Sequence, residues 1–388
     1  MNFIKFVKQT EGGSMIHREI QSVIEKQLFK GKVIIIYGPR RVGKTTLSKL
    51  LVEKEANSRY INCDLLENKA ALETTNSSVL KSFLGNYRLV ILDEAHQIRD
   101  VGRVLKILSD TFPEIQMVAT GSSSFELGNR LAEPLTGRSR EYMVYPFSMT
   151  ELLTVKDRIE LNAEVDWILR FGLYPEVYGK PEHEAMEELS QIASTYLYKD
   201  ILQYEQIKRP GLLLNLLNAL ALQIGNEVSL NELSRMLGET VPTIQRYIEL
   251  LEKAFVIFRL RSYSRNLRKE IAKGQKIYFY DLGIRNALIR NFNPLNLRND
   301  TGALWENFCI VERMKFNMNQ RRFVNSWFWR TYDQKEVDYI EEEGGTMKAV
   351  EFKLKSGGSF KSSREFKANY PVATVMTVTR DNFWEFMI

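Results

Sequence analysis

The chain has little cysteine and little histidine: two and three residues among 388. Cys63 and Cys309 stand far apart, which argues against a disulfide-stapled fold and fits a reducing compartment. His17, His96 and His183 are scattered, so no zinc-ligand spacing is present. No apolar run approaches the ~20 residues of a membrane span, and the amino terminus lacks a signal-peptide pattern. We therefore expect a cytoplasmic protein with no membrane segment.

The rest of the composition is that of an ordinary folded chain. Hydrophobic residues make up 44% and charged residues 26%, which argues against disorder of the bulk. The length favours two or three domains, because single cores rarely grow beyond ~250–300 residues. The net charge of +6 is compatible with a nucleic-acid partner but is only a general property of the surface.

The segment from Val33 to Thr46 carries the most specific motif of the chain. Val33 to Tyr37 is a short β-branched apolar run, which predicts a buried strand. The residues that follow match the phosphate-binding loop Gly-x-x-x-x-Gly-Lys-Thr: Gly38, Pro39, Arg40, Arg41, Val42, Gly43, Lys44 and Thr45, with Thr46 next. Leucines at helical spacing then predict a helix from about Lys44, so strand, loop and helix follow in the required order.

Each part of this loop has a physical role. Its glycines allow the backbone to aim N–H groups at phosphate oxygens, and the helix N-terminus adds a partial positive charge. Lys44 can reach the β- and γ-phosphates, and the Thr45 hydroxyl can ligate Mg²⁺. We therefore predict that the loop binds the triphosphate of an adenine nucleotide together with Mg²⁺.

A second motif follows about fifty residues later in the sequence. Four apolar residues, Leu89 to Leu92, precede Asp93 and Glu94. A buried parallel strand would deliver Asp93 beside the phosphate loop, where it holds Mg²⁺ through water. Glu94 would orient or deprotonate the attacking water. The alternative is a strand that ends in two solvated acids.

Two later segments add candidate residues. The strand predicted over 115–120 runs into Ser122 and Ser123, either of which would sense the γ-phosphate unless this is an ordinary Ser/Gly turn. Arg138 is a candidate for stabilising transition-state charge, in its own chain or in a neighbouring one, and otherwise is a surface arginine. The alternation of strands and helices predicts a parallel sheet with helices on both faces over residues 15–155, after a flexible extension over 1–14.

Together these segments resemble the AAA-superfamily ATPases of one prokaryotic family. The matching segments are Gly38–Thr46, Leu92–His96, Ala119–Ser123, Gly137-Arg138 and Tyr145–Ser148. That family couples such a domain to a C-terminal domain of unknown function 4143, and Gly172–Glu176 and Tyr280–Arg285 also resemble its sequences. The resemblance implies a Mg²⁺-dependent ATPase, in which Lys44, Glu94 and Arg138 are the catalytic candidates.

The middle of the chain predicts a helical linker and a winged helix. After a helical segment over 156–225, residues 226–290 contain two helices joined by a tight turn at Gly238, followed by a hairpin of 256–260 and 276–280. Basic residues cluster around this hairpin and would suit DNA phosphates: Arg259, Arg261, Arg265, Arg268, Lys269, Lys273 and Lys276. Contact with a protein, or plain scaffolding, is the alternative.

Residues 300–388 resemble a PD-(D/E)xK nuclease core, an α/β restriction-endonuclease-like domain. Strands are predicted at 327–330, 336–340 and 349–353, and Glu351 and Lys353 share a strand face. The resemblance implies that Asp338 and Glu351 bind Mg²⁺, that Lys353 positions water and that Glu306 assists. A nuclease-like fold does not by itself imply cleavage.

The sequence thus predicts an ATP-binding, Mg²⁺-dependent ATPase whose nucleotide state repositions its C-terminal modules. Two alternatives remain at this point: an ATP-regulated Mg²⁺-dependent nuclease, and a nucleotide-gated module that binds DNA or a protein without cleaving it. A role for Arg138 in a neighbouring chain would require an oligomer.

Overall fold

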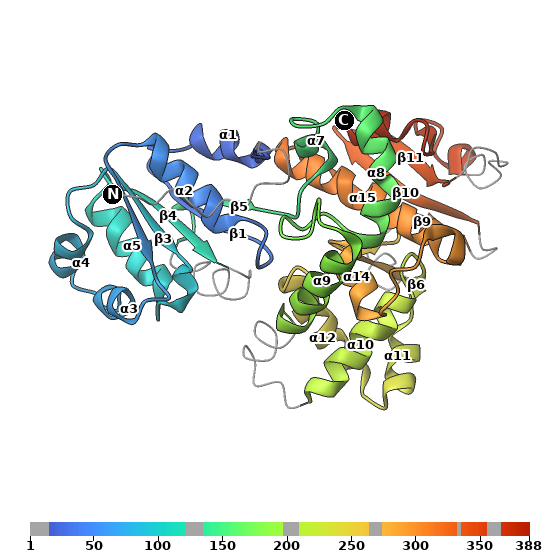
Figure 1. Ribbon diagram of the computed structural model, residues 1–388, viewed down its shortest axis with the longest axis horizontal. Coiled ribbons are helices and arrows are strands. Elements are labelled where there is room, and N and C mark those ends of the chain that lie inside the picture. The colour runs from blue at the N-terminus through green and yellow to red at the C-terminus, as the bar shows by residue number, and fades with distance from the viewer. Residues whose placement is uncertain (1–14, 122–134, 197–208, 264–273, 332–334, 355–365) are drawn as a thin grey trace. The chain divides into compact units, whose positions relative to one another are not determined.

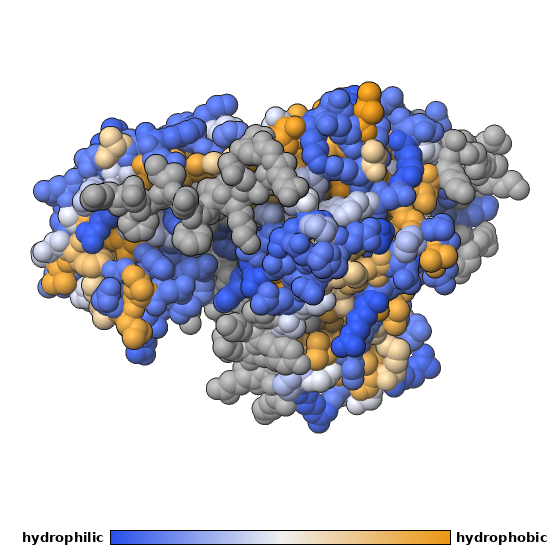
Figure 2. Space-filling model, in the orientation of Figure 1, coloured by the Kyte–Doolittle hydropathy of each residue, from blue (hydrophilic) through white to orange (hydrophobic). Residues whose placement is uncertain are grey.

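The computed structural model describes residues 15–121, 135–196, 209–263, 274–331, 335–354 and 366–388. The chain divides into two compact units, Met1–Phe147 with Lys253–Phe255 and Ser148–Glu252 with Val256–Ile388 (Figure 1). Most of the surface that faces the viewer in Figure 2 is hydrophilic. Within the described ranges, no helix is both long and apolar enough to cross a bilayer.

The first unit is a parallel β-sheet with helices on both of its faces (Figure 1). Its five strands lie in the order β2-β3-β4-β1-β5, and every neighbouring pair is parallel. The elements in chain order are α1 (Glu19–Glu25), β1 (Val33–Tyr37), α2 (Lys44–Lys54), β2 (Ser58–Asn62), α3 (Leu66–Leu72), α4 (Ser77–Leu84), β3 (Leu89–Asp93), the 3₁₀ turn η1 (Ala95–Gln97), α5 (Val101–Thr111), β4 (Gln116–Gly121) and β5 (Ser139–Met143).

The alternation of side chains along β1 explains the two helical layers. Val33 and Ile35 belong to a buried cluster that includes residues of α3, α4 and α5. Ile34 and Ile36 point to the opposite face, on which α2 packs against β2, β3 and β4. Because both faces are covered, β1 and β3 read as continuous apolar runs rather than alternating ones. The parallel sheet predicted from the sequence is confirmed.

The second unit combines helices with two small sheets. Its elements are α7 (Met149–Leu152), α8 (Arg158–Phe171), α9 (Glu182–Tyr196), α10 (Pro210–Leu222), β6 (Glu227–Val228), α11 (Leu230–Leu237), α12 (Val241–Lys253), β7 (Ile257–Arg261), β8 (Gln275–Phe279), α14 (Leu282–Leu288), the 3₁₀ turn η3 (Leu295–Leu297), α15 (Thr301–Asn319), β9 (Asn325–Arg330), β10 (Glu336–Glu343), β11 (Thr346–Phe352), β12 (Thr374–Val378) and α17 (Phe383–Met387).

The predicted helix pair and hairpin are both present in this unit. Helix α11 ends at Gly238, which adopts the left-handed conformation that glycine tolerates, and α12 follows after a short turn. Strands β6, β8 and β7 form an antiparallel three-stranded sheet, and β12, β11, β10 and β9 form the four-stranded sheet. The two sheets are linked where Tyr263 N–H donates to the Phe328 carbonyl (2.6 Å).

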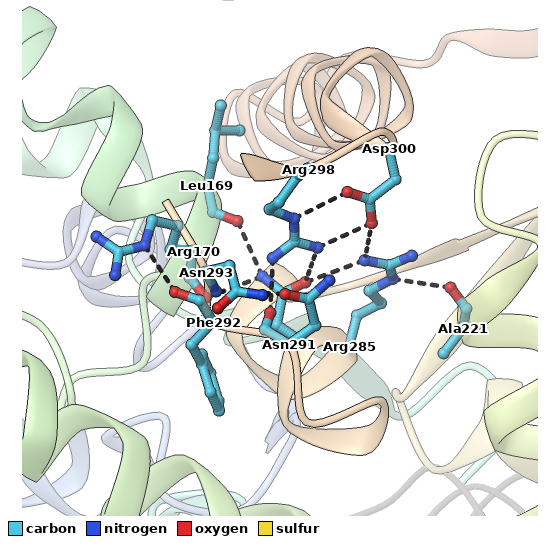
Figure 3. Close-up of polar contacts among 10 residues, drawn as sticks. Leu169, Arg170, Ala221, Arg285, Asn291, Phe292, Asn293, Arg298 and Asp300 are labelled. Carbon is cyan, nitrogen blue, oxygen red and sulfur yellow. Dashed lines mark hydrogen bonds and ion pairs between the residues drawn. The ribbon is translucent and has the colours of Figure 1, made fainter. Parts of the chain in front are cut away.

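A buried polar cluster ties four helices of the second unit together (Figure 3). Asp300, at the start of α15, accepts hydrogen bonds from Arg298 (2.8 Å) and from Arg285 of α14 (2.5 Å). Arg285 also donates to the Ala221 carbonyl of α10 (2.8 Å), and Asn286 donates to the Leu169 carbonyl of α8 (3.0 Å). Burial alone would raise the pKa of Asp300, but the two arginines hold that pKa at about 2. The carboxylate therefore stays ionised and keeps both arginines paired.

Candidate functional site

The loop between β1 and α2 owes its path to glycine. Gly38 has φ 149°, and a Cβ atom there would lie 2.1 Å from the Val144 carbonyl oxygen. Val144 cannot move away easily, because its N–H donates to the Tyr37 carbonyl (2.8 Å) at the end of the parallel pairing with β5. Gly43 caps α2 with φ 95°, again in the left-handed region. The loop thus turns sharply and delivers Lys44 to the first position of the helix.

The side chain of Lys44 lies across this loop. It is buried, and its Nζ donates to the carbonyls of Gly38 (2.9 Å) and Pro39 (2.8 Å). Arg18, the residue directly before α1, donates to the Val42 carbonyl (2.9 Å). The side chains of Lys44 and Arg18 therefore bind the carbonyl groups of the loop, and the Lys44 ammonium group lies beside Gly38 and Pro39.

The carboxylate of Asp93 is fixed by three hydroxyl groups from three different elements. Its Oδ2 accepts from Thr45 Oγ1 of α2 (2.9 Å) and from the Tyr60 hydroxyl of β2 (2.5 Å). Its Oδ1 accepts from Thr120 Oγ1 of β4 (2.5 Å). Hydroxyl and carboxylate oxygens are hard ligands of the kind that Mg²⁺ prefers, so the pair of Thr45 and Asp93 fits this ion.

Glu94 follows in a constrained backbone conformation. Its φ is 53°, uncommon for a residue other than glycine, and its N–H donates to Thr120 Oγ1 (3.0 Å). Glu94 Oε2 lies 3.1 Å from Nδ1 of the buried His96. Burial raises the pKa of Glu94, but His96 and the charges of Lys44 and Arg40 outweigh it and leave the pKa below its ordinary value. The group is an ionised carboxylate at neutral pH.

The structure brings together most of the residues predicted for nucleotide binding. Lys44, Thr45, Asp93 and Glu94 meet at the carboxyl edge of the sheet, with the loop residues 38–43 beside them. Thr46 is exposed in the first turn of α2. Ser122 and Ser123 lie outside the described residues.

Arg138 is placed elsewhere. Its carbonyl accepts from the Val33 N–H (2.9 Å), at the amino end of β1 and therefore at the sheet edge opposite to the loop. Its guanidinium pairs with Asp110 of α5 (2.7 Å). The structure does not bring Arg138 to the phosphate loop of its own chain, and only the role in a neighbouring chain stays a prediction.

Sequence reasoning missed three residues of this site. Thr120, the last residue but one of β4, donates its hydroxyl to Asp93 and accepts from the Glu94 N–H. The feature of the sequence that could have revealed it is a hydroxyl side chain near the end of an apolar strand. His96 follows Glu94 by two residues, and its signal was its place close behind the acidic pair. Tyr60 reaches Asp93 only because β2 lies next to β3, and no local pattern in the sequence reveals that pairing.

The predicted nuclease-like residues are only partly assembled. Glu306 of α15 accepts from Lys276 Nζ (2.9 Å) and from the Tyr278 hydroxyl (2.5 Å), both from β8. Lys276 also pairs with Glu336, and its side chain is 1% exposed. Burial alone would lower the pKa of Lys276, but the carboxylates of Glu306, Glu336 and Asp338 raise it. An internal ammonium group thus lies among these acids.

The remaining three positions of the nuclease-like set, Asp338, Glu351 and Lys353, do not complete a metal site. Asp338 Oδ2 accepts from the Phe352 N–H (2.8 Å), and burial and the charge of Glu306 raise the pKa of Asp338 to about 7. Val350 pairs with Tyr339 in the antiparallel register, so the buried Glu351 lies beside Asp338 on the neighbouring strand, whereas Lys353 is exposed. Across the described ranges, no three side chains of His, Cys, Asp or Glu group as a metal site.

The basic hairpin also differs from the prediction. Lys276 is buried in the acidic cluster, and Arg259 pairs with Glu252 of α12, so these two residues do not offer free charge to phosphates. Arg261 is exposed at the end of β7. Arg265, Arg268, Lys269 and Lys273 lie outside the described residues. The described part of the hairpin therefore gives no support to a DNA surface.

Comparison with known families divides the chain into three consecutive segments. Residues 30–153 match the AAA domain, residues 163–295 match a domain of unknown function, DUF8612, and residues 301–384 match a second one, DUF4143. The predicted helical linker and winged helix thus fall largely within DUF8612, outside the DUF4143 match.

Relatives and solved structures extend over much of the chain. An uncharacterised protein of Mycobacterium tuberculosis is 28% identical over 351 residues, which cover 89% of this chain and 76% of that protein. One of Methanocaldococcus jannaschii is 25% identical over 341 residues, 82% of this chain and 74% of that protein. The structure of a Walker-type ATPase of Pyrococcus abyssi is 17% identical with a TM-score of 0.49 and covers 74% of this chain and 99% of that one.

Proposed function

We propose that this chain, which carries an AAA domain over residues 30–153 and a DUF4143 domain over residues 301–384, binds ATP with Mg²⁺ and hydrolyses it. The observation that supports this best is the 2.9 Å contact between Thr45 Oγ1 and Asp93 Oδ2. It joins the phosphate loop to the acid at the end of β3, although 48 positions separate the two residues. That pairing is the one a nucleotide-bound Mg²⁺ requires.

Each residue of the site has a defined role in this proposal. The N–H groups of residues 38–43 bind the phosphates, and Lys44 leaves the Gly38 and Pro39 carbonyls for phosphate oxygens. Thr45 and Asp93 hold Mg²⁺, which when bound neutralises charge on the β- and γ-phosphates. Glu94 is ionised and accepts a proton from the attacking water.

The second unit is the part of the chain that we expect to respond to nucleotide binding in the first. We infer that the nucleotide state of the first unit changes the position of the second, which carries the DUF8612 and DUF4143 segments. The nuclease alternative has less support, because the predicted residue Glu306 is already paired with the internal lysine Lys276. The same holds for DNA binding, since the described hairpin cations are largely paired.

Steady-state ATP hydrolysis by the full chain tests the proposal. Replacing Glu94 by Gln removes the proton acceptor but keeps the shape of the side chain, so hydrolysis should fall by about 10²–10⁴-fold while ATP still binds. Glu53→Gln, an exposed change on α2 of the same unit, is the matched control and should hydrolyse ATP like the parent chain. A Glu94→Gln chain that hydrolyses ATP as fast as the parent chain would refute the assignment.

A further inference from the structure

We propose that His96 is a positioning residue that fixes the Glu94 carboxylate for the attack of water on ATP, an inference that rests on the function proposed above. The geometry that supports it is the 3.1 Å separation of His96 Nδ1 and Glu94 Oε2. The two residues are two positions apart: Glu94 directly precedes the turn η1 that follows β3, and His96 lies within this turn.

The backbone of Glu94 is held, but its side chain needs a second anchor. Its N–H is bound by Thr120 Oγ1, and its φ of 53° lies in the left-handed region of backbone conformation. The carboxylate itself sits at the end of rotatable bonds and is 25% exposed. A general base must stay within hydrogen-bond distance of the water that it activates. A Glu94 carboxylate without an anchor would spend part of its time in other rotamers, and the rate of ATP hydrolysis would fall.

His96 is suited to be that anchor because its own ring is buried. The ring side chain is only 4% exposed, and its Nε2 lies 3.3 Å from the Gln97 amide nitrogen. His96 belongs to the turn η1, whose neighbours Ala95 and Ile98 are buried in the core cluster of the sheet. A ring held this firmly can define one position for the carboxylate that it contacts.

The electrostatic surroundings agree with this role. Besides His96, the cationic side chains of Lys44 and Arg40 act on the charge of the Glu94 carboxylate. The imidazole thus supplies a close contact at 3.1 Å, in addition to the charges of the loop cations. A histidine that merely fills the core would contribute to stability but leave the turnover number of a folded variant unchanged.

Two substitutions separate these roles. His96→Asn keeps an N–H donor near the position of Nδ1, whereas His96→Leu fills a similar space without a donor. We expect kcat of the Leu variant to fall about 10- to 100-fold, the loss typical of a displaced catalytic group, while kcat of the Asn variant stays within about threefold of the parent. The KM for ATP should stay within about twofold in both, because Glu94 does not hold the phosphates.

The measurement is ATP hydrolysis by the full chain, with ATP binding to each variant as the check on its fold. His183→Leu, at an exposed position of α9, is the matched control and should hydrolyse ATP like the parent. If the Asn and Leu variants bind ATP and turn over equally fast, the positioning role is overturned while the proposed function stands. If the parent chain itself does not hydrolyse ATP, the proposed function fails first, and this inference fails with it.

Discussion

Gly38 is the residue whose backbone the fold constrains most directly. It stands where β1 ends and the chain must pass the Val144 carbonyl, which a Cβ atom would approach to 2.1 Å. Gly43, at the other end of the loop, also has a positive φ, but the nearest atom to its added Cβ is Arg18 Nη1 at 4.0 Å. The two glycines therefore differ in physical role: one is required by space and conformation, and the other by conformation alone.

Gly38→Ala should lower the free energy of unfolding by about 2–4 kcal/mol, because the clash with the backbone adds overpacking to the strain of the loop. Gly43→Ala should cost about 1 kcal/mol, the conformational term without the clash. Calorimetric unfolding of the full chain measures both. Equal losses in the two variants would contradict the assignment of the Val144 contact as the decisive one.

The residues around Asp93 show how far the sequence could predict a site. Thr45 and Asp93 belong to two motifs whose order and spacing are specific, and the structure places them in contact. Tyr60 and Thr120 reach the same carboxylate from β2 and β4, the neighbours of β3 in the sheet. Strand order is a long-range property, so one sequence without its fold could not have supplied these two partners.

At the scale of elements, β8 and α15 are joined by a buried charge cluster. Lys276 of β8 contacts Glu306 of α15 and Glu336 of β10, and the Tyr278 hydroxyl adds a hydrogen bond to Glu306. The sequence placed Lys276 in a basic cluster suited to DNA phosphates, and the nuclease resemblance implied that Glu306 assists a metal site. Their burial depends on the packing of two segments thirty residues apart, which no local pattern reveals.

Lys276→Met should lower the free energy of unfolding by about 1–3 kcal/mol, because it leaves the partly buried carboxylates of Glu306 and Glu336 without their cation. Lys367→Met removes an exposed lysine of the same unit and serves as the control, with an expected change within about 0.5 kcal/mol. Urea unfolding at neutral pH measures both. A Lys276→Met chain as stable as the control would contradict the structural role of this cluster.

At the scale of the whole molecule, the chain joins a nucleotide-binding unit to a second unit with its own core. The cluster of Arg285, Arg298 and Asp300 connects the end of the DUF8612 segment to the start of the DUF4143 segment (Figure 3). The second unit is therefore tied together across the boundary between its two families. If nucleotide turnover moves it, we expect these segments to move together.

The helices and strands of the first unit could be predicted from its sequence, because their apolar residues form short runs or recur at helical spacing. Glycine and acidic residues then mark the ends of β1 and β3. The second unit was harder: its helix pair, hairpin and sheet strands were predicted, but the network that joins α8, α10, α14 and the start of α15 depends on side chains such as Arg285 and Asn286. These polar residues are buried, and a pattern of polarity alone assigns them to the surface.

The binding of ATP to the full chain, measured by titration calorimetry, tests the central claim most directly. The account predicts one ATP per chain in the presence of Mg²⁺, weaker binding after the metal is chelated, and loss of binding on Lys44→Ala in a chain that remains folded. Binding of ATP that is equally tight in the Lys44→Ala chain, or no binding by the parent chain, would contradict it.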